Sequence, residues 1–145
     1  MLADYLTPDV IRLRIRVSNW QEAVRAGGQL LMQAGKCGLS YVESMVRAVQ
    51  EMGPYMVLAP GLALAHARPE DGADVVGLSL VTLATPVEFG SETNDPVSVV
   101  ISFCAPDHES HIGMLQSLAE FLINEDNQRL LKTAETVDEI LSAVI

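Results

Sequence analysis

The fold of this chain depends on the stretch Val97-Ser98-Val99-Val100-Ile101-Ser102-Phe103-Cys104. A nearly continuous run of β-branched and apolar residues is typical of a central strand in a sheet. Residues 75–85 have the same character and predict a second strong strand. The segment between them, residues 86–96, contains Gly90, Asn94 and Asp95, and these turn-forming residues predict a surface loop.

Helices and shorter strands are expected around this strand pair. Alternating apolar and charged residues predict a strand over residues 10–17, and two short strands, 55–59 and 62–67, flank the turn at Pro60-Gly61. Apolar residues at helical spacing predict helices over residues 20–34, 40–52, 108–123, 126–133 and 137–145. Because strands and helices interleave, we expect an α/β fold, a three-layer α/β/α sandwich around a mixed sheet of about five strands.

Local patterns add detail to three of these elements. Arg12, Arg14 and Arg16 alternate along the first strand, so we expect them on one solvated face. Gly27-Gly28 weakens the middle of the first helix by roughly 1 kcal/mol per glycine relative to alanine, which indicates that close packing requires both. The segment Ser40-Tyr41-Val42-Glu43 has the spacing of a capping box and predicts the start of the second helix.

Composition indicates one domain without nucleic-acid or membrane contacts. The chain has 145 residues, 49% of them apolar, so we expect a single domain over residues 1–145. A net charge of −10 argues against nucleic acid, because phosphate backbones require clustered lysine and arginine. We expect no membrane insertion, since no apolar stretch approaches the roughly 18 residues of a span and the N-terminus lacks a basic signal region. Cys37 and Cys104 are expected to be reduced thiols in a cytoplasmic protein.

The first candidate functional residue is His66. It stands near the end of an apolar run, just before Arg68-Pro69, where proline takes the chain out of the sheet. A neutral imidazole beside a cation can act as a nucleophile, a base or a ligand. Glycine and alanines around His66 leave space for another macromolecule to approach. The alternative is an inert histidine that only finishes a strand.

The second candidate is His111, which lies where the central strand ends and a helix begins. Backbone N–H groups and the helix dipole attract anions at such a position. If the two strand ends lie on the same edge of the sheet, the imidazoles of His66 and His111 can meet. A solvated or cap-adjacent histidine is the alternative for His111. His108 and Glu109 are better explained as exposed residues of the first helical turn.

Three other kinds of site are not supported by the sequence. Residues 28–36 resemble a phosphate-binding loop, but six residues separate the glycines and Cys37 replaces the required serine or threonine. The acidic residues and histidines over residues 107–111 lack a metal-binding spacing, so we expect no metal. A serine hydrolase would need a Gly-x-Ser-x-Gly motif, and the sequence has none.

The segment around His66 resembles the active-site segment of a known family. The residues that carry this resemblance are Gly53-Pro54-Tyr55, Ala59-Pro60-Gly61, His66 and Arg68-Pro69-Glu70. They are similar to the IIA components of the sugar phosphotransferase system (PTS) of the mannitol–fructose type, and in particular to the ascorbate branch. Later stretches agree with this family, namely Leu80-Val81-Thr82-Leu83, Asn94-Asp95-Pro96-Val97 and His111-Ile112-Gly113.

The resemblance implies a phosphotransferase that carries a phosphoryl group between proteins. His66 would accept the phosphoryl group from phosphorylated HPr and pass it to a cysteine of a IIB component, for uptake of a sugar or a sugar acid such as ascorbate. His111 would be the second active-site histidine, facing His66. Apart from the resemblance, the chemistry of phosphoryl transfer requires donors to the phosphoryl oxygens, and Ser110 and Arg68 are the expected phosphate-binding residues beside the two histidines. Transfer from one phosphohistidine to another residue needs no metal, nucleotide or other cofactor.

The sequence departs from the family at two places. Ala65 stands where the family often has proline, and Glu51-Met52-Gly53 supplies no arginine near the end of the second helix, so Arg68 is the expected substitute. Two alternatives stay open, a regulatory IIA-like protein that controls a partner and a binding module with structural histidines. The sequence also leaves open which sugar is transported and whether the chain forms a homodimer.

Overall fold

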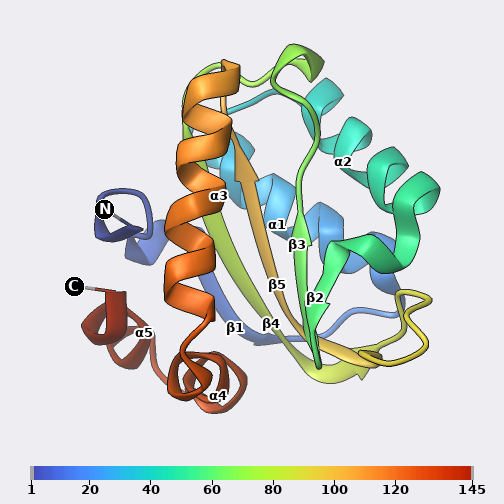
Figure 1. Cartoon of the computed structure of the whole chain (residues 1–145), viewed down its shortest axis with the longest axis vertical. Coiled ribbons are helices and arrows are strands. Elements are labelled where there is room, and N and C mark those ends of the chain that lie inside the picture. Colours follow the sequence, from blue (N-terminus) through green and yellow to red (C-terminus); the bar gives the residue numbers. More distant parts are fainter. Residues whose placement is uncertain (1, 145) are drawn as a thin grey trace.

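The computed structural model describes residues 2–144 and contains a five-stranded sheet with helices on both faces (Figure 1). The strands are β1 (Ile11–Ile15), β2 (Val57–Ala59), β3 (Leu62–Ala65), β4 (Gly77–Val87) and β5 (Val97–Cys104). The α-helices are α1 (Trp20–Gln33), α2 (Leu39–Met52), α3 (His108–Leu122), α4 (Glu125–Thr133) and α5 (Val137–Val144). The short 3-10 helices are η1 (Leu2–Asp4), η2 (Pro8–Val10), η3 (Gly53–Met56) and η4 (Pro69–Asp71). Residue 145, the last one of the final predicted helix, lies outside the described residues.

The sheet is mixed, as the sequence predicts. Its strand order is β1-β4-β5-β3-β2, so Val97–Cys104 is the central strand. β4 and β5 are antiparallel, with Leu78 opposite Phe103, whereas β3 and β5 run parallel. The parallel pairing carries the C-terminal ends of β3 and β5 to the same edge of the sheet.

Helices cover both faces of this sheet (Figure 1). α1 and α2 pack on one face around a core that includes Val24 and Met45. α3, α4 and α5 pack on the other face, around a second core that includes Leu118 and Ile140. The predicted three-layer α/β/α sandwich is therefore confirmed. Within residues 2–144, no helix has the length and apolar character needed to cross a membrane.

The predicted start of the second helix is wrong. α2 begins at Leu39 with Gly38 as its N-cap residue, and no side chain caps it. Ser40 therefore lies inside the first turn. The Glu43 carboxylate accepts hydrogen bonds from Arg25 of α1 at 3.1 and 3.3 Å instead of capping its own helix. An ion pair with a neighbouring helix, which local spacing does not reveal, decides the position of this carboxylate.

β1 is shorter and less regular than predicted. Arg14 has a φ of 56°, in the left-handed region, and the pairing with β4 shifts register around it. Leu13 packs against the core on the α3 face, whereas Ile15 packs against the core on the α1 face. Arg12, Arg14 and Arg16 are all exposed, as expected. They do not share one face of a regular strand, because Leu13 and Ile15, on either side of Arg14, point to opposite faces of the sheet.

Close packing requires the glycine pair in α1, as predicted. A Cβ atom on Gly28 would lie 2.6 and 2.9 Å from the two methyl groups of Val42 in α2. A Cβ atom on Gly27 would lie 2.5 Å from Oγ of Ser102 in β5, and Oγ of Ser79 donates a 2.9 Å hydrogen bond to the Gly27 carbonyl. α1 therefore approaches both α2 and the sheet closely at this point.

The Gly28→Ala substitution should destabilise the protein although alanine favours helices. Both Val42 methyl groups obstruct the new Cβ atom, so rotation of that side chain does not relieve the overlap. We expect overpacking to lower the free energy of unfolding by about 2 kcal/mol, measured by urea denaturation. Gly113→Ala in α3 is the matched control, because nothing lies within 4 Å of its added Cβ atom. A Gly28→Ala protein as stable as the native one would contradict the packing requirement.

Candidate active site

His66 and His111 meet at the edge of the sheet where β3 and β5 end. His66 directly follows β3, and Ala65 before it pairs with Ser102 of β5. β5 leads through residues 105–107 into α3, whose first turn carries His111. The centroids of the two imidazole rings lie 5.6 Å apart, with their planes at 59°. The prediction that the two imidazoles can meet is confirmed.

Phe103 forms an apolar floor beneath the two histidines. Its ring stacks on that of His66, with centroids 5.0 Å apart and planes at 19°, and lies 5.1 Å from the ring of His111. Burial lowers the pKa of His66, and the neighbouring His111 lowers it further, against a raising effect of the Leu64 carbonyl. Burial also lowers the pKa of His111. Both rings are therefore neutral at physiological pH.

Hydrogen bonds determine which nitrogen of each ring carries the proton. Nδ1 of His66 lies 3.3 Å from the Leu64 carbonyl oxygen, which can only accept, so Nδ1 is protonated and Nε2 keeps its lone pair. Nδ1 of His111 is buried and has no hydrogen-bond partner within residues 2–144. A buried N–H without an acceptor is unfavourable, so we assign the proton of His111 to Nε2. The pair offers a nucleophilic nitrogen on His66 and an N–H donor on His111.

The two histidines open into a pocket of about 580 Å³. Its walls come from α2, from the segment after β3 and from the start of α3. The lining residues are Ser44, Arg47, Ala48, Glu51, Met52, Met56, His66, Ala67, Arg68, Pro69, Glu70, Asp71, His108 and His111. His66 is half-buried, so its ring is accessible from the pocket. The pocket is large enough for a group that a second molecule presents, and its two arginines, Arg47 and Arg68, are the cations that could bind an anion there.

Two arginines of this pocket differ in their partners. Arg68 forms a two-point ion pair with Asp71, whose carboxylate oxygens lie 3.3 Å from Nε and 3.2 Å from Nη2. This hydrogen bonding lowers the pKa of Asp71. Arg47 extends from α2, donates a 3.0 Å hydrogen bond to Oγ of Ser44 and forms no ion pair within residues 2–144. Arg47 is therefore the more available of the two cations for an incoming anion.

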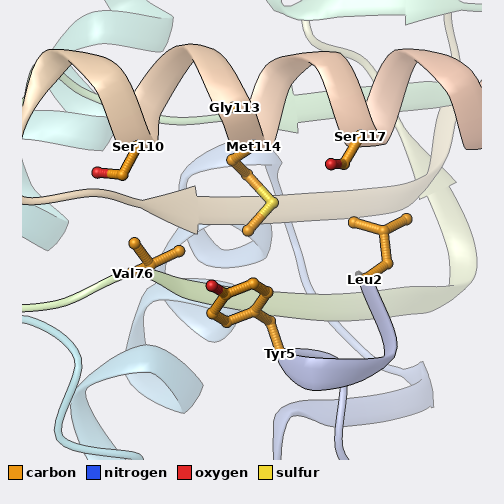
Figure 2. Close-up of a pocket in the computed structure, with 7 residues that line it drawn as sticks. All are labelled: Leu2, Tyr5, Val76, Ser110, Gly113, Met114 and Ser117. Atoms are coloured by element: carbon orange, nitrogen blue, oxygen red, sulfur yellow. The ribbon is translucent and has the colours of Figure 1, made fainter.

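The structure does not bring Ser110 into this pocket. Its hydroxyl and its backbone N–H each donate a 2.8 Å hydrogen bond to Oδ1 of Asp107, the N-cap residue of α3. Figure 2 shows Ser110 on the side of α3 that faces Tyr5 and Val76, beside a small cavity of about 70 Å³. Ser110 thus stabilises the start of α3 and lines a different pocket from His111.

The remaining polar residues at the start of α3 are exposed. His108 lines the rim of the pocket, and Glu109 lies beside it in the first turn, as expected. No group of three His, Cys, Asp or Glu side chains that could hold a metal ion occurs in the part of the chain that the structure describes. The polar groups that line the pocket are imidazoles, guanidiniums, carboxylates and the hydroxyl of Ser44.

Sequence reasoning missed Arg47, although a signal for it exists. Ser44, Arg47, Ala48 and Glu51 all line the pocket. Residues three and four positions apart share one face of a helix. A search for cations along that face of α2, beyond its final turn, would have found Arg47.

Sequence reasoning also missed Tyr41, which holds the two strand ends together. Tyr41 is fully buried. Its hydroxyl accepts a 3.1 Å hydrogen bond from the Ala67 N–H and lies 3.0 Å from the Phe103 carbonyl oxygen, to which it donates. These partners lie 26 and 62 residues away along the chain, so no local pattern reveals them.

Comparison with known proteins shows the family of this chain. A family model described as "Phosphoenolpyruvate-dependent sugar phosphotransferase system, EIIA 2" matches residues 4–145. The chain is 42% identical over 135 residues to the "Ascorbate-specific PTS system EIIA component" of Salmonella typhimurium, covering 90% of this chain and 88% of that protein.

Solved structures agree with this family and with the fold. The solution structure of the mannitol-specific cryptic phosphotransferase enzyme IIA from Escherichia coli has a TM-score of 0.89 and 33% identity, covering 99% of this chain and 97% of that one. The complex of mannitol enzyme IIA with phosphorylated enzyme IIB from Escherichia coli contains a chain with a TM-score of 0.84 and 26% identity, covering 95% of both. The resemblance predicted from the residues around His66 is confirmed.

Both active-site imidazoles should titrate below the usual histidine range. Because burial favours the neutral ring, NMR titration of imidazole nitrogen shifts should give midpoints for His66 and His111 below about 6.5. The unfolded chain binds more protons below that pH, so the free energy of unfolding should fall as the pH drops from about 6.5 through the folded-state pKa values. A midpoint for His66 at or above that of the urea-unfolded chain would contradict this environment.

Proposed function

The chain belongs to the EIIA 2 family of phosphoenolpyruvate-dependent sugar phosphotransferase systems, whose members are phosphotransferases, and we propose that it carries the phosphoryl group on Nε2 of His66. The observation that carries this proposal is the free lone pair of that nitrogen, which results from the hydrogen bond between Nδ1 and the Leu64 carbonyl. The facing ring of His111, 5.6 Å away, supplies an N–H donor beside the same pocket.

The donor in this proposal is phosphorylated HPr. Nε2 of His66 attacks phosphorus while the N–P bond of the donor's phosphohistidine breaks and the donor ring regains its electron pair. The proton of His66 stays on Nδ1 and is donated in a hydrogen bond to the Leu64 carbonyl oxygen, which stabilises the positive charge that the ring acquires. Ala65 and Ala67 on either side of His66 are small and buried, so they do not obstruct the approach of the donor ring.

The acceptor in this proposal is a cysteine of a IIB component. Its thiolate attacks phosphorus, an S–P bond forms as the N–P bond of His66 breaks, and the imidazole returns to its neutral state. The similarity to the enzyme IIA chain found in complex with phosphorylated enzyme IIB supports this kind of partner. The pocket is open enough for a partner side chain to approach His66 from the solvent side.

His111 and Arg47 are the groups that we expect to stabilise the phosphoryl oxygens. Negative charge lies on these oxygens in the transition state, so N–H donors and cations beside them lower the barrier. His111 and Arg47 line the same pocket as His66. Arg68 contributes less, because Asp71 already occupies its guanidinium. Ser110 is left out of this set, because its hydroxyl is bound to Asp107.

The solute that this carrier serves is proposed to be a sugar acid of the ascorbate type. The support is the name of a relative that is 42% identical to this chain. In this arrangement the membrane component binds the solute, and the carrier does not. We further propose a cytoplasmic location and a single IIA domain over residues 1–145, in line with a family match that extends over residues 4–145.

Incubation with enzyme I, HPr and radiolabelled phosphoenolpyruvate should label the chain once, through an acid-labile bond. His66→Gln should abolish the label, because Nε2 is the attacking atom. His108→Gln is the matched control on the rim of the same pocket and should label normally. His111→Ala should accept the label and pass it to a purified IIB component at least about tenfold more slowly. An acid-labile label on His66→Gln would refute the proposal, and a lack of passage to IIB by the native chain would favour a regulatory role.

Arg47→Gln should slow phosphoryl uptake more than Arg68→Gln. We expect a rate lower by about tenfold or more for Arg47→Gln, because the pocket loses its unpaired cation, and by less than about threefold for Arg68→Gln. Label taken up from phosphorylated HPr and quenched at successive times measures both rates. Urea denaturation of each variant checks that it is folded. The reverse order would make Arg68 the principal cation of the site.

A further inference from the structure

Two cysteines lie next to the active site and take no part in the chemistry proposed for His66. Cys104 is the last residue of β5 and follows Phe103, whose ring stacks on His66. Cys37 lies in the connection between α1 and α2, where it forms a β-bridge with Ala73. Both are buried free thiols.

The packing of the chain holds these two thiols together. Sγ of Cys104 lies 3.8 Å from the carbonyl oxygen of Lys36, the residue before Cys37, and 3.4 Å from that of Val75. Each thiol also shifts the pKa of the other, which agrees with this proximity. A Cβ atom on Gly77 would lie 2.7 Å from the Lys36 side chain and 3.1 Å from Sγ of Cys104. The absence of a side chain at Gly77 is what allows these groups to approach.

The two thiols differ in their acidity. Hydrogen bonding from Cys104 lowers the pKa of Cys37, although burial opposes this, whereas the same contact and burial raise the pKa of Cys104. The thiolate is the nucleophilic form of cysteine, so Cys37 reacts first with an oxidant. Gly35 and Gly38 beside it are exposed, and a small oxidant can approach from this side.

We propose that Cys37 and Cys104 form a redox site, which a hydroperoxide oxidises to an intramolecular disulfide that slows phosphoryl transfer at His66. The Cys37 thiolate attacks one peroxide oxygen, the O–O bond breaks, and hydroxide or an alkoxide leaves while Cys37 becomes a sulfenic acid. The sulfur of Cys104 then attacks the sulfur of Cys37 and the S–O bond breaks. The hydroxyl group leaves as water with the thiol proton of Cys104. The two thiols together give up two electrons, which reduce the peroxide.

Tyr41 and Phe103 connect this redox site to His66. Tyr41 lies in the first turn of α2, four residues after Cys37. Its hydroxyl accepts a 3.1 Å hydrogen bond from the Ala67 N–H and donates a 3.0 Å hydrogen bond to the Phe103 carbonyl oxygen. An S–S bond is much shorter than a hydrogen bond between thiols, so it draws the start of α2 toward the end of β5. This changes the position of the Phe103 ring on which His66 rests. The coupling to His66 rests on the proposed function, whereas the disulfide does not.

The disulfide is tested on the full chain with hydrogen peroxide. Both free thiols, counted after denaturation, should disappear, the mass should fall by about 2 Da for the two hydrogens lost, and dithiothreitol should reverse both changes. A peptide map should contain Cys37 joined to Cys104. Cys37→Ala and Cys104→Ala are the matched controls and should form no internal disulfide. Two thiols that survive peroxide, or a disulfide only between chains, would overturn the site.

The coupling is tested by the rate of phosphoryl uptake from phosphorylated HPr. The oxidised chain should take up the label about tenfold or more slowly than the reduced chain, and dithiothreitol should restore the rate. Peroxide should leave the rate of Cys37→Ala unchanged, which controls for oxidation of methionines in the pocket. Equal rates before and after a verified disulfide would overturn the coupling. Absence of uptake by the reduced chain would overturn the proposed function, while the thiol count decides the disulfide independently.

Discussion

The parallel pairing of β3 with β5 is the constraint on which the site depends. The register that sets Ala65 beside Ser102 brings the ends of both strands to one edge of the sheet. His66 and the start of α3, far apart in the sequence, therefore face each other there. α2 closes over the same edge and contributes both a buried hydroxyl and a cation to it, from Tyr41 and Arg47. A different register would separate these groups without changing any single element.

His66 occupies a position between the core and the solvent, and both sides matter for its chemistry. The stacked ring of Phe103 keeps water from its inner face, which favours the neutral imidazole. The charged pocket on its other side allows an anion and a partner protein to approach. A fully exposed ring would be protonated more readily, and a fully buried ring would be closed to a partner. The Cys37–Cys104 pair lies against the same strand end, so a bond between these sulfurs would act on the floor of the site.

Much of the fold and part of the site could be predicted from the sequence. Hydrophobic periodicity identified the central strand and the helices around it, and the cost of two glycines within a helix revealed the close packing of Gly27-Gly28. Prediction failed where a contact between elements outweighs a local preference. Glu43 pairs with Arg25 instead of capping α2, and Arg14 breaks the regular alternation of β1. Ser110 is a different case, because a local contact three residues away, the hydrogen bond to the N-cap residue Asp107, already engages its hydroxyl.

The sequence by itself determined the order and type of the elements, the family resemblance, and the presence of histidines at two strand ends. These properties follow from patterns among residues that are close along the chain. Only the tertiary structure decided that Arg47 lines the pocket, that Tyr41 joins the two strand ends, and that the thiol of Cys104 lies against the backbone next to Cys37. The physical reason is that strand register and helix packing bring these groups together across tens of residues, and neither is encoded in a local pattern.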